Sequence, residues 1–240
     1  MSIIKNDFEK QNITKIKKAK NNKKLTVITA YDALFAKLFE EIADMILVGD
    51  SLNMSFAGQN DTLSATLDQM IYHTNAVCKG APNTFVILDM PFGSYINENQ
   101  ALENAIKVYR DTSAAAIKIE GGEDRAHIVK HLTNNSIAVM GHIGLMPQYV
   151  RSEGGYKVRG KTQEDIDQLV RDATAIEKAG AFAMVLEGVK TEAAVAVTKA
   201  VNIPVIGIGA GNVTDGQVLV WSDMLGFFEE FKPKFVRHYL

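Results

Sequence analysis

Short apolar segments recur along the chain, separated by longer segments that mix apolar and polar residues. Eight of the short segments hold five to seven residues each, mostly aliphatic or β-branched and without regular polar alternation. Such segments are typical of parallel strands that are buried on both faces. The predicted strands cover residues 25–30, 45–50, 85–90, 116–120, 137–142, 182–187, 203–209 and 217–223.

Most segments between these strands carry apolar residues three and four positions apart, which is the spacing of an amphipathic helix. Asn97 and Thr162 are suitable capping residues at helix starts, and Gly80 and Gly180 lie near helix ends. A further helix is predicted at 13–21, before the first strand. The other predicted helices cover residues 32–43, 66–80, 97–114, 123–135, 162–180 and 190–201.

Eight strands alternating with helices predict an α/β protein with a parallel sheet. The number eight favours closure into a (β/α)8 TIM barrel, and an open doubly wound sheet is the alternative. We therefore expect residues 1–240 to form a single (β/α)8 barrel catalytic domain, with the extra N-terminal helix closing its bottom. Few residues follow the eighth strand, so the C-terminal helix is expected to be short or missing.

Composition excludes several classes of protein. The 240 residues are 47% hydrophobic and 22% charged, with a formal net charge of −2, which gives no general reason to expect nucleic acid or an acidic membrane as partner. The basic stretch 15–24 reads as a solvated helix and turn. Cys78 is the only cysteine, so no intrachain disulfide or cysteine-based zinc site is expected. We find no signal peptide and no apolar stretch near the ~20 residues of a membrane helix, and expect a cytoplasmic protein.

Ionisable side chains end consecutive predicted strands. Asp50 and Ser51 end the second, Asp89 the third, and His142 and Glu187 the fifth and sixth. In the fourth strand, two ionisable residues lie two positions apart and therefore share a face, opposite two isoleucines. These two residues are Lys118 and Glu120. Because active sites of TIM barrels lie at the carboxyl ends of the strands, this set predicts an active site.

The residue types indicate the chemistry. Asp50, Asp89 and Glu120 offer hard oxygen ligands that suit Mg²⁺. Lys118 suits the carboxylate or keto oxygen of an α-keto acid. Glu187 is the candidate base for a proton next to a carbonyl, and a bound metal would stabilise the resulting enolate.

Two further features are weaker. His142 either faces the site or is a buried structural histidine. The long basic loop 146–163 is typical of a lid or binding segment, although a solvated loop fits its composition as well. Its cations are Arg151, Lys157, Arg159 and Lys161.

The sequence closely resembles the ketopantoate hydroxymethyltransferase family, with the family's motifs in order and spacing from about Lys24 to the C-terminus. The matching segments are VGDSL (48–52), DTLSATLDQMIYHT (61–74), LDMPFGSY (88–95), IKIEGG (117–122), GHIGLMPQ (141–148), GGYKVRGK (154–161) and IPVIGIGAGNVTDGQVLV (203–220).

The resemblance implies transfer of a hydroxymethyl group from 5,10-methylenetetrahydrofolate to 3-methyl-2-oxobutanoate, giving 2-dehydropantoate in pantothenate and coenzyme A biosynthesis. It implies that Asp50 and Asp89 bind Mg²⁺ and that Glu120 completes the metal shell. The keto acid then lies against Ser51 and Lys118, beside the metal-bound aspartates. The resemblance further implies a homo-oligomer, a decamer, with Glu187 as proton acceptor.

Two other functions remain open at this point. One is a Mg²⁺-dependent carbon–carbon lyase or phosphonopyruvate-type mutase on a related barrel. Such lyases often use a cysteine in a Lys-Cys-Gly-His context, which this chain lacks. The other is a non-catalytic ligand-binding barrel, which the presence of all the predicted acidic groups together with Lys118 disfavours.

Overall fold

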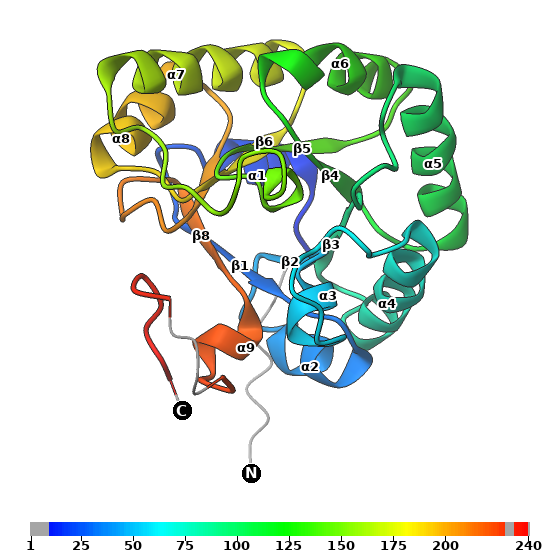
Figure 1. Ribbon diagram of the computed structural model, residues 1–240. Helices are drawn as coiled ribbons and strands as arrows, with labels where there is room; N and C mark the ends of the chain where they lie inside the picture. Colours follow the sequence, from blue (N-terminus) through cyan, green and yellow to red (C-terminus); the bar gives the residue numbers. More distant parts are fainter. Residues whose placement is uncertain (1–9, 229–232, 240) are drawn as a thin grey trace.

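The computed structural model describes residues 10–228 and 233–239. Within these residues eight strands form a closed parallel barrel in chain order, with β8 paired to β1 (Figure 1). The predicted (β/α)8 barrel is confirmed, and the open doubly wound sheet is wrong. The strands are β1 (Leu25–Thr29), β2 (Met45–Val48), β3 (Phe85–Asp89), β4 (Ala116–Glu120), β5 (Val139–Gly144), β6 (Ala183–Glu187), β7 (Val205–Ile208) and β8 (Gly216–Leu219).

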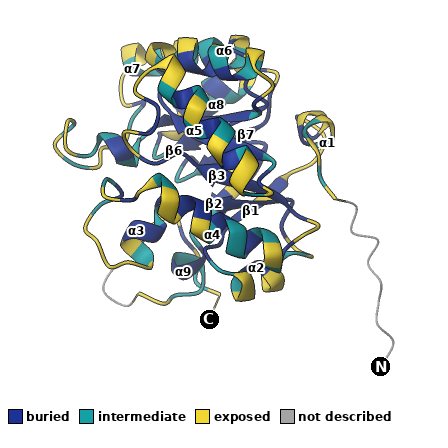
Figure 2. Ribbon diagram, turned by 90° about the vertical axis from the view of Figure 1, so that its right-hand side faces the viewer, coloured by how far each residue is buried: buried dark blue, intermediate teal, exposed yellow. Residues whose placement is uncertain are grey.

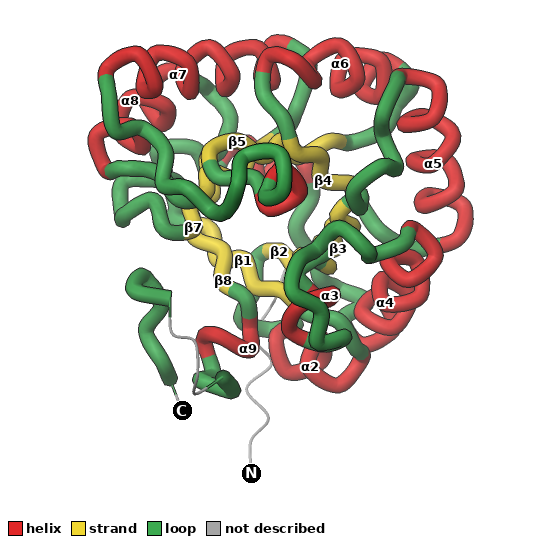
Figure 3. Tube along the Cα trace, viewed as in Figure 1, coloured by secondary structure: helices red, strands yellow, loops and turns green. Residues whose placement is uncertain are grey.

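Helices surround the ring of strands (Figure 3). The predicted caps form, because the side chain of Asn97 accepts from the Gln100 N–H and that of Thr162 from the Asp165 N–H. The outer helices are α2 (Ala33–Phe39), α4 (Leu67–Gly80), α5 (Glu98–Asp111), α6 (Ala126–Asn134), α7 (Gln163–Lys178) and α8 (Thr191–Ala200). Shorter elements are α3 (Leu52–Ser55), α9 (Trp221–Met224) and the 3₁₀ turns η1 (Glu123–Arg125) and η2 (Pro147–Tyr149).

One predicted strand is wrong in its second half. The segment 217–223 ends its strand at Leu219, and the helix α9 begins at Trp221. The backbone N–H of Trp221 donates to the Thr29 hydroxyl at 3.0 Å. The Trp221 ring stacks on Phe35, with ring centroids 3.9 Å apart. These contacts take the chain away from the barrel wall and end the strand.

Two apolar cores lie on the two sides of the barrel wall, and Figure 2 shows the buried strands inside more exposed helices. The inner core fills the barrel with side chains such as Val27, Met45 and Ile87. The outer core lies between strands and helices and includes Ile117 and Ile119. This confirms that the two isoleucines of β4 face away from its two charged residues.

The predicted N-terminal helix forms as α1 (Ile13–Lys18) and closes the base of the barrel. Its Ile16 is fully buried in the inner core. The reading of residues 15–24 as solvated is wrong for Lys20, which is buried and forms an ion pair of 2.8 Å with Asp215. The lysine is drawn inward because Asp215 lies at the base, just before β8.

Among the described residues, the helix that follows β8 is short, as predicted, because α9 spans 4 residues. Beside it, a hollow of about 430 Å³ lies on the outer wall of β1 and β8, lined by Thr26, Ile28 and Leu219 among others. Among the described residues, none of the helices combines the length and apolar character needed to span a membrane.

Candidate active site

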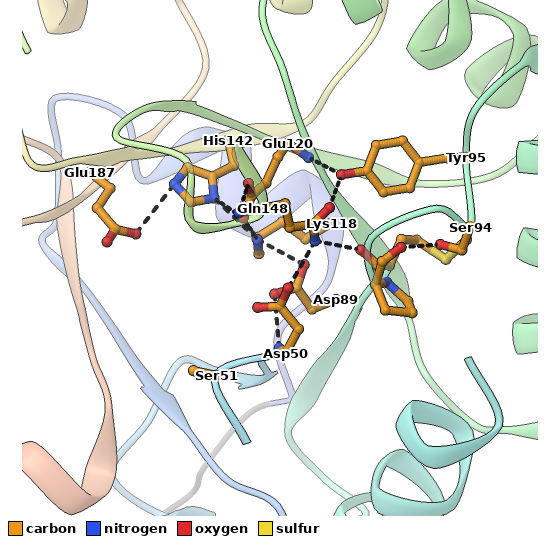
Figure 4. Close-up of polar contacts among 12 residues, drawn as sticks. Asp50, Ser51, Asp89, Ser94, Tyr95, Lys118, Glu120, His142, Gln148 and Glu187 are labelled. Atoms are coloured by element: carbon orange, nitrogen blue, oxygen red, sulfur yellow. Dashed lines mark hydrogen bonds and ion pairs between the residues drawn. The ribbon is translucent and has the colours of Figure 1, made fainter. Parts of the chain in front are cut away.

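The structure brings all the predicted site residues together at the carboxyl ends of five consecutive strands (Figure 4). Parallel pairing sets Asp89 beside Lys118 and Glu120 beside His142. Because side chains alternate across a strand, Lys118 and Glu120 both point into the barrel mouth. The set is Asp50, Ser51, Asp89, Lys118, Glu120, His142 and Glu187.

Lys118 lies at the centre of this group. Its Nζ is 2.8 Å from Asp89 Oδ1 and 3.8 Å from Glu120 Oε1, and it is 3.1 Å from Nδ1 of His142. The Lys118 side chain is only 4% exposed. Burial alone would lower the pKa of this lysine, but the surrounding carboxylates raise it above its ordinary value. Lys118 is therefore an ammonium ion held by two carboxylates.

Asp50 and Ser51 follow β2, where the chain turns into α3. The backbone N–H of Asp50 donates to Asp89 Oδ2 at 3.1 Å, so the two aspartates are neighbours. Burial and the charges of Asp89 and Glu120 raise the pKa of Asp50 well above its ordinary value. Burial also raises the pKa of Asp89, although Lys118 opposes the shift. The Ser51 hydroxyl is fixed by a hydrogen bond of 2.9 Å to the Tyr31 hydroxyl.

His142 connects Glu120 to Glu187. Its Nδ1 lies 3.5 Å from Glu120 Oε1, and its Nε2 lies 3.3 Å from Glu187 Oε2. Burial and Lys118 lower the pKa of the imidazole, but the nearby carboxylates of Glu120 and Glu187 raise it to about 9. Burial raises the pKa of Glu120, and His142 and Lys118 outweigh this effect and lower it below the ordinary value. Of the two alternatives for His142, the structure supports the one in which it faces the site.

Glu187 differs from the other charged groups in its exposure. Its side chain is 23% exposed, whereas those of His142 and Glu120 are 3% and 1% exposed. In Figure 4 it lies at the edge of the cluster, on the side away from Tyr95. A substrate that enters the mouth can therefore reach this carboxylate.

Sequence reasoning missed two residues of the site, Gln148 and Tyr95. Gln148 follows β5 in η2, and its side chain donates to Asp50 Oδ2 at 2.9 Å. Tyr95 follows β3, and its hydroxyl donates to the Gln148 side-chain oxygen. Both residues lie inside motifs of the family resemblance, LDMPFGSY and GHIGLMPQ. That membership was the available signal, because neither residue ends a strand.

The carboxylate oxygens of Asp50, Asp89 and Glu120 are ligands that suit a divalent cation. Their present arrangement is not that of a complete metal-binding site. Among the residues that the structure describes, no three His, Cys, Asp or Glu side chains form a group ready to hold a metal ion. The Lys118 ammonium lies between Asp89 and Glu120 and separates them. Asp89 Oδ1 and Glu120 Oε1 are both buried, and they face the Lys118 ammonium at 2.8 and 3.8 Å without meeting hydrogen-bond geometry.

The balance of charges at the barrel mouth also favours a bound cation. Within the described part of the chain, four carboxylates at the mouth face the Lys118 ammonium and the His142 imidazole, which is cationic only when protonated. Buried carboxylates need cations or hydrogen bonds to stay ionised. Burial is the main cause that raises the pKa values of Asp50 and Asp89, and a bound cation would stabilise their ionised forms. These two hard oxygen donors suit Mg²⁺.

Other candidate residues lie elsewhere. Cys78 lies in α4, outside the barrel wall, where burial raises the pKa of its thiol. Arg151 and Arg159 of the basic loop are already paired with carboxylates, those of Asp61 and Asp165. The mouth therefore has carboxylates, an ammonium group and an imidazole as its reactive groups.

A closed parallel barrel with these groups at its mouth defines the protein as an enzyme of the (β/α)8 barrel class. The sequence matches the family model described as ketopantoate hydroxymethyltransferase over residues 10–240. The chain belongs to the ketopantoate hydroxymethyltransferase family, which confirms the resemblance found in the sequence.

Curated relatives named 3-methyl-2-oxobutanoate hydroxymethyltransferase agree with the family match. The relative from Aliarcobacter butzleri is 80% identical over 240 residues, covering 100% of this chain and 89% of the relative. The relative from Sulfurimonas denitrificans is 68% identical over 232 residues, covering 97% of this chain and 88% of the relative.

Solved structures of lower identity share the fold. A crystal structure of 2,3-dimethylmalate lyase, a PEP mutase/isocitrate lyase superfamily member, has a TM-score of 0.65 at 18% identity, covering 89% of this chain and 82% of that chain. A crystal structure of phosphonopyruvate hydrolase, in complex with oxalate and Mg²⁺, has a TM-score of 0.65 at 15% identity, covering 87% and 80%. These similarities concern the barrel alone.

Proposed function

We propose that the protein transfers a hydroxymethyl group from 5,10-methylenetetrahydrofolate to 3-methyl-2-oxobutanoate, giving 2-dehydropantoate and tetrahydrofolate with the uptake of one water. The observation that carries the proposal is the family match over residues 10–240. The groups at the barrel mouth supply what this reaction needs, namely sites for an anionic keto acid, a cation and a base. The proposal treats residues 1–240 as one catalytic domain.

Asp50 and Asp89 are the proposed Mg²⁺ ligands, with Glu120 as a more distant member of the set. Support comes from their adjacent carboxyl groups and from the balance of charges at the mouth described above. When bound, Mg²⁺ supplies positive charge that stabilises negative charge on a substrate oxygen.

Lys118 and Ser51 are the proposed partners of the keto acid, together with the two aspartates. The ammonium group of Lys118 attracts the substrate carboxylate, and Asp89 and Glu120 hold it in place. The Ser51 hydroxyl can donate a hydrogen bond to the substrate because Tyr31 already fixes its position. In the proposed complex, binding to these groups would direct the C3 carbon of the substrate toward Glu187.

Glu187 is the proposed base that removes the proton from C3 of the keto acid. Its partial exposure lets the substrate reach it, and His142 holds it from the buried side at 3.3 Å. The carbon that loses its proton then forms the new bond to the one-carbon unit of the folate. General bases of this kind contribute typically about 10²–10⁴-fold to a rate.

A direct assay tests the proposal. The protein is mixed with Mg²⁺, 3-methyl-2-oxobutanoate and 5,10-methylenetetrahydrofolate, and 2-dehydropantoate is measured by mass spectrometry. We expect product only when all components are present. Absence of product, with the folded protein verified by circular dichroism, would contradict the proposed function.

A lyase or mutase function is the alternative that the shared barrel fold raises. The described mouth offers no cysteine, because Cys78 lies in α4 on the outside of the barrel. The same preparation should therefore leave 2,3-dimethylmalate and phosphonopyruvate unchanged. Turnover of either compound would favour the alternative.

We further propose that the protein is a cytoplasmic homo-oligomer, a decamer. The family resemblance supports the assembly, and the single cysteine fits a reducing compartment. Sedimentation at micromolar concentration should show a species several times heavier than the 26.3 kDa chain. A single species at the mass of the monomer would contradict the proposed assembly.

A further inference from the structure

We infer that Gln148 and Tyr95 form a positioning pair that holds Asp50 for cation binding. The inference rests on the proposed function, because it takes Asp50 as a ligand of the cation. Neither residue is expected to touch the reacting atoms. Their contribution is to the orientation of one carboxylate.

Gln148 contacts two of the three carboxylates of the predicted metal set. Its side-chain Nε2 donates to Asp50 Oδ2 at 2.9 Å and to the Met90 carbonyl at 3.0 Å. Its backbone N–H donates to Glu120 Oε2 at 3.0 Å. The residue is only 4% exposed, so water does not compete for these bonds. One residue of the loop after β5 thus links carboxylates that come from β2 and β4.

Tyr95 fixes the direction in which the Gln148 amide points. The Tyr95 oxygen accepts the Glu120 backbone N–H at 3.4 Å, and its hydroxyl donates to Gln148 Oε1. A glutamine amide has an oxygen that accepts and a nitrogen that donates. Turning it over would place Oε1 against Asp50 Oδ2 and the Met90 carbonyl, where only acceptors meet. The chain of bonds therefore keeps the donating nitrogen on Asp50.

This arrangement leaves the second oxygen of Asp50 available. Among the described residues, no hydrogen-bond donor or cationic group contacts Asp50 Oδ1. The amide of Gln148 is neutral, so it orients the carboxylate without balancing its charge. Asp50 is therefore held with Oδ2 anchored by Gln148 and Oδ1 free to bind a cation.

The decisive variants differ in which bond they remove. Gln148→Met keeps the length of the side chain and the backbone N–H to Glu120, but removes both amide donors. Gln148→Glu keeps the shape and places a second carboxylate against Asp50. Tyr95→Phe keeps the amide and removes the hydroxyl, which bonds both Gln148 Oε1 and the Glu120 backbone N–H. Gln163→Met is the matched control, because Gln163 is exposed at the start of α7 and donates to Asp167.

The measured quantity is the Mg²⁺ affinity in the presence of 3-methyl-2-oxobutanoate, by isothermal titration, with circular dichroism and melting temperature on every variant. Loss of an outer partner of a metal ligand typically lowers affinity about 10–100-fold, and we expect this for Gln148→Met. Gln148→Glu should bind Mg²⁺ no better than Gln148→Met, Tyr95→Phe should show a smaller loss, and Gln163→Met none. Exchange of the C3 proton should recover in Gln148→Met at saturating Mg²⁺, so that the apparent KM for Mg²⁺ rises more than kcat falls.

The possible results either support or overturn the positioning role of Gln148 and Tyr95. Wild-type affinity in a folded Gln148→Met overturns the inference and leaves the proposed function standing. Absence of Mg²⁺-dependent keto-acid binding in the wild-type protein overturns both. If Gln148→Met does not fold, Tyr95→Phe decides, because unchanged affinity in that variant removes the orienting role of the pair.

Discussion

Both ends of the barrel bury ion pairs, but the hydrogen bonding of the buried charged atoms differs between the base and the mouth. At the base, Lys20 Nζ contacts Asp215 Oδ2 at 2.8 Å and also donates to the Thr198 carbonyl at 2.7 Å. The same Asp215 oxygen accepts the Val205 N–H at 2.9 Å. At the mouth, three buried atoms of the ionisable groups lie near opposite charges but have no partner in hydrogen-bond geometry among the described residues. They are Asp89 Oδ1, Glu120 Oε1 and His142 Nε2.

This difference distinguishes a structural ion pair at the base from a candidate binding site at the mouth. Buried polar groups in folded proteins are almost always hydrogen-bonded, so incomplete ones need an explanation. The Lys20–Asp215 pair at the base has its hydrogen bonds complete and holds the segment after α1 against the barrel. Under the proposed function, a cation and a substrate would add the missing charges and donors at the mouth. Substitutions at the base should therefore lower stability, and substitutions at the mouth should lower binding and activity.

The largest effect is expected at the base, from Lys20→Met. This change leaves the Asp215 carboxylate buried without its cation, which typically costs about 3–5 kcal/mol. The free energy of unfolding, from urea titration, should fall by that amount. Activity per folded molecule should stay at the wild-type value. Loss of activity without loss of stability would show that Lys20 serves activity rather than stability.

The next effect is expected at the mouth, from Asp89→Asn. A neutral amide is a poorer ligand for Mg²⁺, so Mg²⁺-dependent keto-acid affinity should fall at least about 100-fold, the upper end of what an outer partner contributes. Isothermal titration measures this, and Asp50→Asn should behave likewise.

Asp89→Asn removes the nearest carboxylate from the buried Lys118, but Glu120 remains 3.8 Å from its ammonium group. Stability should therefore fall less than in Lys20→Met. The folded-state pKa of Asp89 is raised, mainly by burial, so ionised Asp89 opposes folding at neutral pH. A neutral side chain removes that opposition. Unchanged keto-acid affinity in this variant would remove Asp89 from the cation site.

The smallest effect is expected from Lys23→Met, which matches Lys20→Met in chemistry and in location. Lys23 pairs with Asp44 at the base, but its side chain is 61% exposed. Asp44 also accepts the Thr26 N–H at 3.0 Å. Exposed cations contribute about 0–1 kcal/mol, so urea titration should show a change within that range. A loss as large as that of Lys20→Met would show that burial does not set the difference.

The sequence predicted the barrel and its charged residues because both depend on regular patterns. Lys118 and Glu120 are two positions apart in a strand, and parallel pairing then places them beside Asp89 and His142. Such relations follow from the period of a strand and from the order of strands in a barrel.

Features that depend on how irregular segments fold were not predictable in this way. Gln148 and Tyr95 follow strands in loops, and their contacts depend on how those loops fold over the mouth. Lys20 was expected to be solvated because its neighbours are polar, yet the position of α1 brings it onto Asp215. Trp221 has an apolar ring that suits a strand, but its packing on Phe35 ends β8.

The most direct test of the account is exchange of the C3 proton of 3-methyl-2-oxobutanoate with D₂O, followed by NMR without folate. This isolates proton removal from one-carbon transfer. Glu187→Gln keeps the size of the side chain and removes its basicity, so exchange should fall at least about 10²-fold while Mg²⁺-dependent keto-acid binding is retained. Glu192→Gln, at an exposed position in α8, is the matched control and should exchange at the wild-type rate. Wild-type exchange in Glu187→Gln would contradict the account and leave His142 as the next candidate base.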